Sequence, residues 1–260
     1  MTNFLIGYPD IPFRATAFTA SAAEDPSYPL KNLITGGRGK MFQFNAAQTS
    51  YWIKADMGAS ATASMQFFFL ARANMLKKAG VTQCILQSSP NDAAWTNRIG
   101  TSANFQSKTF TGPRSEDLLF TQTFNDDAAN YSSSAIRYWR ITGLTTSSKM
   151  MFSKFYLGNW FDFGREPIAP IVQRRQAYNS KNREARHIFK MTWQGVDDTT
   201  RQSFMEKILR YKDINPVILY DTADLILNDM RTLHAWITEC KVRPITYNRN
   251  DISLTFEEAI

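Results

Sequence analysis

The chain has 260 residues, of which 43% are hydrophobic and 13% aromatic, and it carries a formal net charge of +7. This length suits one large domain or two small ones, and since no apolar stretch reaches about 18 residues, the sequence excludes a transmembrane helix. The positive charge is a mild excess without a basic tail, so it favours acidic surfaces without requiring nucleic acid.

The residues that usually carry catalysis are sparse. Two cysteines and two histidines occur, and neither histidine, His187 or His234, lies at metal-ligand spacing from a cysteine or a carboxylate. No nucleophile elbow, P-loop or paired-histidine zinc motif is present. Asp197 and Asp198 are better explained as the N-terminal cap of a helix. We therefore expect no enzyme activity, no metal site and no cofactor.

The first two thirds of the chain predict a β-rich domain. Residues 1–30 mix apolar and small polar residues around four prolines, which suits an edge segment and loops. Residues 100–133 are polar with little periodicity and predict a long loop. Strands are predicted between these segments, where large apolar and polar residues alternate or apolar runs are short: 51–58, 65–72, 82–87, 137–143 and 154–158.

Several of these segments resemble motifs of one known family. Residues 51–58, Y-W-I-K-A-D-M-G, resemble the W-I-x-x-D-[LM]-G strand of discoidin-type (coagulation factor 5/8 C-like) domains, and 137–143 resemble their R-Y-[VW]-R-I strand. Residues 154–158 are similar to the closing strand, and 88–95 to the S-x-D-G-x-x-W turn. The resemblance implies a galactose-binding-like jelly-roll β-sandwich over residues 1–163, a fold that binds glycans, lipid surfaces or proteins through its loops.

The same resemblance suggests where a ligand would bind. The segment 35–44 falls among the loops that contact ligands in the family, and Asn32 stands near a usually acidic position, which weakens the case for a retained carboxylate. Trp52, inside a strand motif, is expected in the core. The candidate ligand or partner residues are Arg38, Met41, Phe42, Phe44 and Trp95. Their rings could form a glycan platform or belong to the core, since aromatic faces serve both purposes.

Cysteine usage departs from the family's secreted members. Those members often join the two ends of the domain with a disulfide, whereas Cys84 and Cys240 fall in different expected domains. The N-terminus also lacks the basic and apolar regions of a signal peptide. We therefore expect a protein made in a cytoplasm, with two free, buried thiols.

The last third predicts a second, smaller domain. Prolines three residues apart mark a linker at 164–170, and the domain then spans 171–260. A helix is predicted from Asp197, with an apolar face and a stop at Asn215-Pro216. Strands are predicted at 187–193, 217–220, 233–238 and 252–256. The fold class is therefore mainly β: a jelly-roll β-sandwich followed by an α+β domain with one helix packed on an antiparallel sheet.

This element order resembles the ring-forming domains of bacteriophage tail and baseplate proteins, including distal-tail-like proteins. The resemblance covers residues 168–260 and includes the final strand, I-S-L-T-F-E-E. It implies a homo-oligomer that binds other virion proteins. A basic cluster in this region fits a solvated face, a subunit interface or a lumen through which DNA passes: Arg174, Arg175, Arg183 and Arg186.

Two functions follow from these resemblances. The first is a structural virion protein of a phage tail or baseplate, assembled in the host cytoplasm by symmetric protein–protein contacts, with the discoidin-like domain contacting neighbours or a host-surface glycan. The alternative is a carbohydrate-binding module of a bacterial protein. Exposed aromatics and carboxylates gathered at the 35–50 and 88–98 loops would favour the alternative. An enzyme with an appended β-sandwich is disfavoured, because the catalytic residues are missing.

Overall fold

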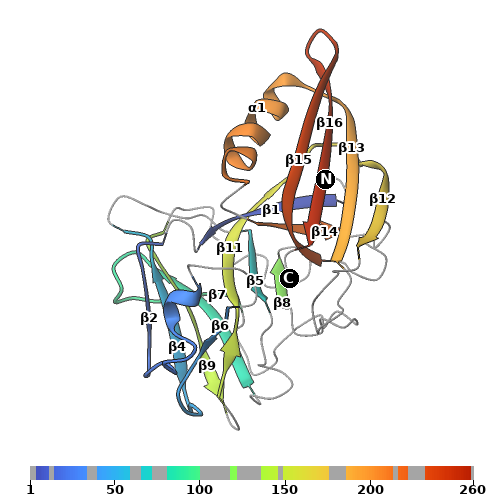
Figure 1. Ribbon diagram of the computed structural model, residues 1–260. Coiled ribbons are helices and arrows are strands. Elements are labelled where there is room, and N and C mark those ends of the chain that lie inside the picture. Colours follow the sequence, from blue (N-terminus) through green and yellow to red (C-terminus); the bar gives the residue numbers. More distant parts are fainter. Residues whose placement is uncertain are drawn as a thin grey trace. The chain divides into compact units, whose positions relative to one another are not determined.

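The computed structural model describes residues 4–11, 15–33, 40–58, 66–71, 81–99, 118–121, 136–145, 149–175, 186–212, 216–221 and 232–258. These described residues are mainly β, with one α-helix and antiparallel sheets (Figure 1). The chain divides into two compact units, one formed by Pro9–Asn159 and the other by Met1–Tyr8 together with Trp160–Ile260. None of the described helices is long and apolar enough to cross a membrane.

This division differs from the expected one at both ends of the first domain. β1 (Phe4–Ile11) pairs with β14 (Val217–Asp221), so the first residues join the second unit instead of the first. β12 (Ile168–Arg175) begins inside the expected linker. The N-terminal segment reads as a short apolar run, and such a run gives no indication of which sheet it will join.

The Pro9–Asn159 unit contains an antiparallel sheet in the order β2-β4-β9-β6-β7. Its strands are β2 (Ala17–Ala20), β4 (Tyr51–Asp56), β9 (Tyr138–Thr145), β6 (Val81–Ser89) and β7 (Thr96–Ile99). A second set, in the order β11-β5-β8, comprises β11 (Lys154–Phe161), β5 (Phe67–Ala71) and β8 (Leu118–Thr121). The unit also holds η1 (Leu30–Leu33) and the short pair β3 (Phe42–Gln43) and β10 (Met151–Phe152).

The core of this unit follows from alternation along its strands. Tyr51, Ile53 and Ala55 of β4 are buried, as are Trp139 and Ile141 of β9, and they share one cluster with residues of β5 and β11. Side chains of opposite parity point out of this core. Burying each large apolar side chain contributes about 1.5–3 kcal/mol, so this cluster is the main source of stability for the β-sandwich.

The other unit has strands in the order β12-β13-β16-β15-β14-β1. The strands not yet described are β13 (Arg186–Val196), β15 (Thr232–Thr246) and β16 (Arg249–Glu258). The helix α1 (Asp198–Lys207) lies against this sheet in Figure 1, followed by η3 (Leu209–Tyr211). Phe204 and Ile208 join a buried cluster that includes Phe163, Met191 and Trp193. The predicted helix-on-sheet arrangement is therefore confirmed.

The start of α1 confirms the predicted cap. Asp197 Oδ1 accepts a hydrogen bond from the Thr200 N–H at 2.8 Å, and Oδ2 accepts one from Thr200 Oγ1 at 2.9 Å. These bonds hold the pKa of Asp197 below its ordinary value. Met205 of α1 and Tyr211 of η3 remain exposed, so Phe204 is the apolar side chain that α1 buries.

Candidate functional site

The outward side of the five-stranded sheet carries a continuous row of polar side chains. Strand register places Thr19, Lys54, Arg140, Gln87 and Asn97 opposite one another across all five strands. Register partners share one face of an antiparallel sheet, about 4.5–5.5 Å apart between Cβ atoms. All five side chains are half-buried or exposed. We call the side of the sheet that carries this row the outer face.

Three aromatic rings accompany the polar row, and each lies beside a cation. Lys54 Nζ lies 5.6 Å from the centroid of the Trp52 ring and 5.8 Å from that of Tyr138. Arg140 Cζ lies 3.9 Å from the centroid of the Trp95 ring. A cation over an aromatic face contributes about 0.5–1 kcal/mol at exposed sites. The rings are therefore held in place by neighbouring side chains while remaining half-buried.

Trp52 was expected in the core and lies on the outer face instead. Its neighbours Tyr51 and Ile53 are fully buried, and alternation along β4 turns Trp52 to the side of Lys54 and Asp56. Lys54 and Asp56 follow Trp52 at intervals of two residues, so all three lie on the same side of the strand. Two charged residues on that side were the signal that could have placed Trp52 correctly.

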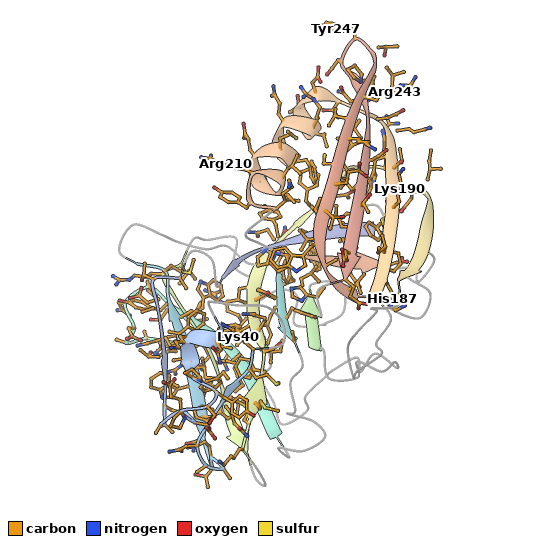
Figure 2. The ribbon with its side chains drawn as sticks, viewed as in Figure 1. Lys40, His187, Lys190, Arg210, Arg243 and Tyr247 are labelled. Atoms are coloured by element: carbon orange, nitrogen blue, oxygen red, sulfur yellow. The ribbon has the colours of Figure 1, made fainter. Side chains whose placement is uncertain are left out.

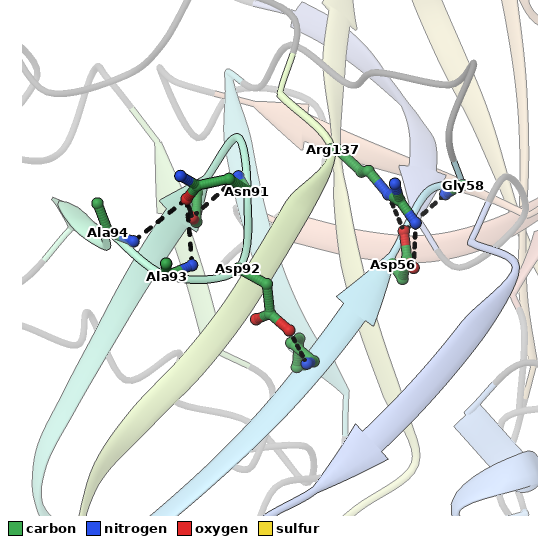
Figure 3. A network of polar contacts seen from close by, with 9 residues as sticks. Asp56, Gly58, Asn91, Asp92, Ala93, Ala94 and Arg137 are labelled. Atoms are coloured by element: carbon green, nitrogen blue, oxygen red, sulfur yellow. Dashed lines mark hydrogen bonds and ion pairs between the residues drawn. The ribbon is translucent and has the colours of Figure 1, made fainter.

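One end of the outer face is fixed by an ion pair. Arg137 donates two hydrogen bonds to the carboxylate of Asp56, from Nε at 2.8 Å and from Nη2 at 2.9 Å (Figure 3). Asp56 Oδ1 also accepts from the N–H of Gly58, whose φ of +87° suits glycine. The bonds from Arg137 are the largest cause of a lowered pKa at Asp56, against the opposing effect of burial.

The turn between β6 and β7 brings a second carboxylate to this face. Asn91 Oδ1 accepts hydrogen bonds from the N–H groups of Ala93 and Ala94, at 3.1 and 3.2 Å, which closes the turn (Figure 3). Asp92 occupies the glycine position of the S-x-D-G-x-x-W motif and has φ of +63°. Its Oδ2 lies 2.5 Å from Lys54 Nζ. The turn therefore links β6 to β4 across β9.

In the middle of the row, side-chain amides hold Arg140. Arg140 Nε donates to Gln87 Oε1 at 2.7 Å, and Gln87 Nε2 donates in turn to Asn97 Oδ1 at 2.7 Å. Partial burial lowers the pKa of Arg140. The arrangement offers fixed donors and acceptors beside apolar ring faces, which suits recognition of a ligand that is both polar and apolar.

His187, His234 and Cys240 belong to the other unit and not to the one that carries this face. No group of three histidine, cysteine or acidic side chains within those residues could hold a metal ion. Cys240 is a free, half-buried thiol whose pKa is raised by burial. His187 lies in β13 with Nδ1 2.9 Å from Glu258 Oε2, and His234 is buried in β15. Both histidines therefore lie in strands, as predicted.

The predicted ligand loop divides between core and surface. Phe42 and Phe44 are fully buried in the core cluster, and their rings pack edge to face with centroids 5.0 Å apart. Met41 is half-buried, and Trp95 lies on the outer face beside Arg140. Arg38 lies outside the described residues. Phe42 and Phe44 are two residues apart, and alternation along a strand turns such residues to the same side, which is the signal that could have placed both rings together.

The described members of the predicted basic cluster lie on β12 and β13. Arg175 is the register partner of Arg186, and Arg174 is the partner of His187. Arg183 lies outside the described residues. The role of this cluster as an interface or lumen face stays a prediction.

Comparisons with known proteins find no matching family model and no matching curated protein. Among solved structures, chitosan-binding module 1 of a chitosanase/glucanase from Paenibacillus sp. IK-5 is 14% identical, with a TM-score of 0.41 over 56% of this chain and 96% of that chain. Module 2 of the same enzyme, in complex with chitotriose, is 15% identical, with a TM-score of 0.40 over 56% of this chain and 98% of that chain. CBM32-1 from a family 31 glycoside hydrolase of Clostridium perfringens is 14% identical, with a TM-score of 0.37 over 56% of this chain and 97% of that chain.

Proposed function

We propose that this chain is a non-catalytic carbohydrate-binding protein and that the outer face binds the glycan. The observation that carries this proposal is the row of fixed polar groups across the sheet with half-buried rings at its sides, Trp52, Tyr138 and Trp95. A sugar ring has an apolar C–H face and a rim of hydroxyls. An aromatic face matches the first, and amides and charged side chains match the second.

The expected affinity is modest because the face is a sheet surface. Stacking one sugar ring would cover about half of the roughly 200 Å² that an aromatic side chain can bury, or about 2.5 kcal/mol. Hydrogen bonds from groups such as Asn97 and Lys54 add to this, and ordering the ligand subtracts from it. We expect dissociation constants of roughly 0.1–1 mM for a short oligosaccharide.

Prior ordering of the side chains supports binding at this face. The Asp56–Arg137 and Lys54–Asp92 pairs and the bond from Arg140 to Gln87 already fix the groups that would meet a ligand. Fewer rotamers then have to be immobilised on binding, at about 0.5–1.5 kcal/mol each.

Binding of oligosaccharides to the full chain, followed by calorimetry, tests this proposal. Trp95→Ala and Trp52→Ala should each weaken binding about tenfold or more, the equivalent of about 1.4 kcal/mol. Tyr28→Ala is the matched control, since Tyr28 is an aromatic residue of the same unit that is exposed and lies outside the five-stranded sheet. Equal losses in all three variants, or none in any, would contradict the proposal.

Self-assembly as a structural virion protein is a second candidate, favoured by the β15–β16 hairpin. Tyr247 lies at the hairpin turn (Figure 2) and is 99% exposed. Ile245, two residues earlier, is 52% exposed. Aromatic side chains that become buried when two proteins associate carry much of the energy of protein interfaces. The occupant would be a second copy of this chain, and a place in a phage tail or baseplate stays a prediction. Light scattering should then show an oligomer that Tyr247→Ser and Ile245→Ser dissociate, whereas a monomer at all concentrations would contradict this candidate.

A further inference from the structure

The charges on the outer face do not balance. Two of its cations pair with carboxylates, Lys54 with Asp92 and Arg137 with Asp56. Within the described part of the chain, Arg140 has no carboxylate at ion-pair distance. The more distant charge of Asp92 raises the pKa of Arg140, but less than burial lowers it. Among the described residues the face therefore has one cation in excess, at the middle of its polar row.

We infer that the outer face selects glycans bearing an oxyanion, either a carboxylate or a sulfate ester, and that Arg140 binds this group. The inference rests on the proposed carbohydrate binding and specifies its ligand class. An arginine presents its donors in a planar fork that matches two oxygens of such a group.

The geometry of Arg140 leaves that fork available. Nε is used by Gln87, and the guanidinium lies over the Trp95 ring with Cζ 3.9 Å from the centroid. No hydrogen bond from the Nη groups to another described residue accompanies these contacts. The ring and the amide fix the plane of the guanidinium, so an arriving oxyanion does not have to order it. The same ring would stack on the sugar that carries the oxyanion.

Partial burial makes an anion more favourable at this position. Burial lowers the pKa of Arg140, which reflects the cost of removing its charge from water without a counter-ion beside it. A bound oxyanion would supply that counter-ion, and hydrogen bonds to charged groups are stronger than neutral ones.

A nucleic acid would also present oxyanions, but the face suits it poorly. A phosphate backbone needs several uncompensated cations along its path. Here Asp56 and Asp92 lie beside the polar row and neutralise the other two cations. One net positive charge between two carboxylates fits a single acidic substituent on a sugar better than a polyanion.

Calorimetry with four probes on the full chain tests the inference. The probes are a neutral galactose tetrasaccharide, a galacturonate tetrasaccharide, a sulfated galactose tetrasaccharide and a thymidine oligonucleotide of equal charge. At least one acidic tetrasaccharide should bind about tenfold more tightly than the neutral one. The two acidic probes distinguish a carboxylate from a sulfate as the preferred group.

Variants of Arg140 then assign the preference to this side chain. In Arg140→Gln the ratio of acidic to neutral affinity should fall from about ten to about one, and Arg140→Lys should retain part of the ratio because it keeps the charge without the fork. The matched control is Arg210→Gln, because Arg210 belongs to the other unit and also lies over an aromatic ring, that of Tyr211. This variant should keep the full ratio of acidic to neutral affinity. Thermal unfolding of each variant checks that it folds.

The outcomes separate this inference from the proposed function. Equal affinity for neutral and acidic probes would overturn the oxyanion preference and leave carbohydrate binding standing. No binding of any tetrasaccharide would overturn both. An equal loss for neutral and acidic probes in Arg140→Gln would show that Arg140 only supports Trp95, and tighter binding of the oligonucleotide would favour nucleic acid as the ligand.

Discussion

Replacing Phe44 by alanine decides whether segment 41–44 belongs to the core or to a ligand loop. Phe44 is 0% exposed, and its ring packs against that of Phe42. The Phe42 ring packs in turn against that of Phe152, with ring centroids 5.6 Å apart. Truncation of a fully buried phenylalanine removes its transfer free energy and leaves a cavity, at a cost of about 3–5 kcal/mol. For a unit of this size, that loss should lower the melting temperature by roughly 10 °C.

Differential scanning calorimetry of the full chain measures this effect, and Tyr28→Ala is again the control. Tyr28 is exposed, so its truncation should change stability by less than about 0.5 kcal/mol. The reasoning would be refuted if Phe44→Ala unfolded at the temperature of the original chain while losing oligosaccharide binding. That result would place the Phe44 ring at a ligand surface, which is one of the two alternatives that the sequence left open.

Three further predictions concern charged groups of the same unit. Asp92→Gly should keep the turn, since glycine accepts a φ of +63°, and should weaken binding at the outer face by freeing Lys54; Asp92→Val should lower the melting temperature as well. The Arg137 guanidinium holds the pKa of Asp56 below the ordinary 3.8, so the resulting stability is complete above that value and is lost as the pH falls through the lowered pKa. Melting temperatures between about pH 5 and about pH 2 should therefore fall more steeply in the original chain than in Asp56→Asn. Burial lowers the pKa of Lys154 to about 8, with a smaller contribution from a neighbouring lysine, so the unfolded chain binds more protons above that pH and stability should rise toward pH 10.5. Lys154→Met should remove this rise, and an unchanged slope in the variant would assign it to other groups.

The strands and the helix cap could be predicted because their signals are local. β4 alternates at every position from Tyr51 to Asp56, and the structure buries every second residue. Asp197 caps α1 through bonds to Thr200, three residues along the chain. In both cases a short stretch of sequence contains the whole physical cause.

What the sequence did not reveal depends on contacts between distant segments. β1 joins β14, more than 200 residues away, and no local pattern specifies that partner. The outer face brings Lys54, Asp92 and Arg140 together from three places in the chain. The interaction of Arg140 with Trp95 depends on this register, so the site could be found only once the strands were aligned.

The most direct test of carbohydrate binding at the outer face is NMR of the tryptophan indole N–H groups during titration with the neutral and acidic tetrasaccharides. Trp52 and Trp95 are half-buried on that face, whereas Trp139 is buried and donates its indole N–H to Ile136 O at 3.0 Å. We predict that the indole signals of Trp52 and Trp95 shift with added tetrasaccharide while that of Trp139 does not. Shifts elsewhere with Trp52 and Trp95 unchanged, or no shift at millimolar tetrasaccharide, would contradict binding at this face.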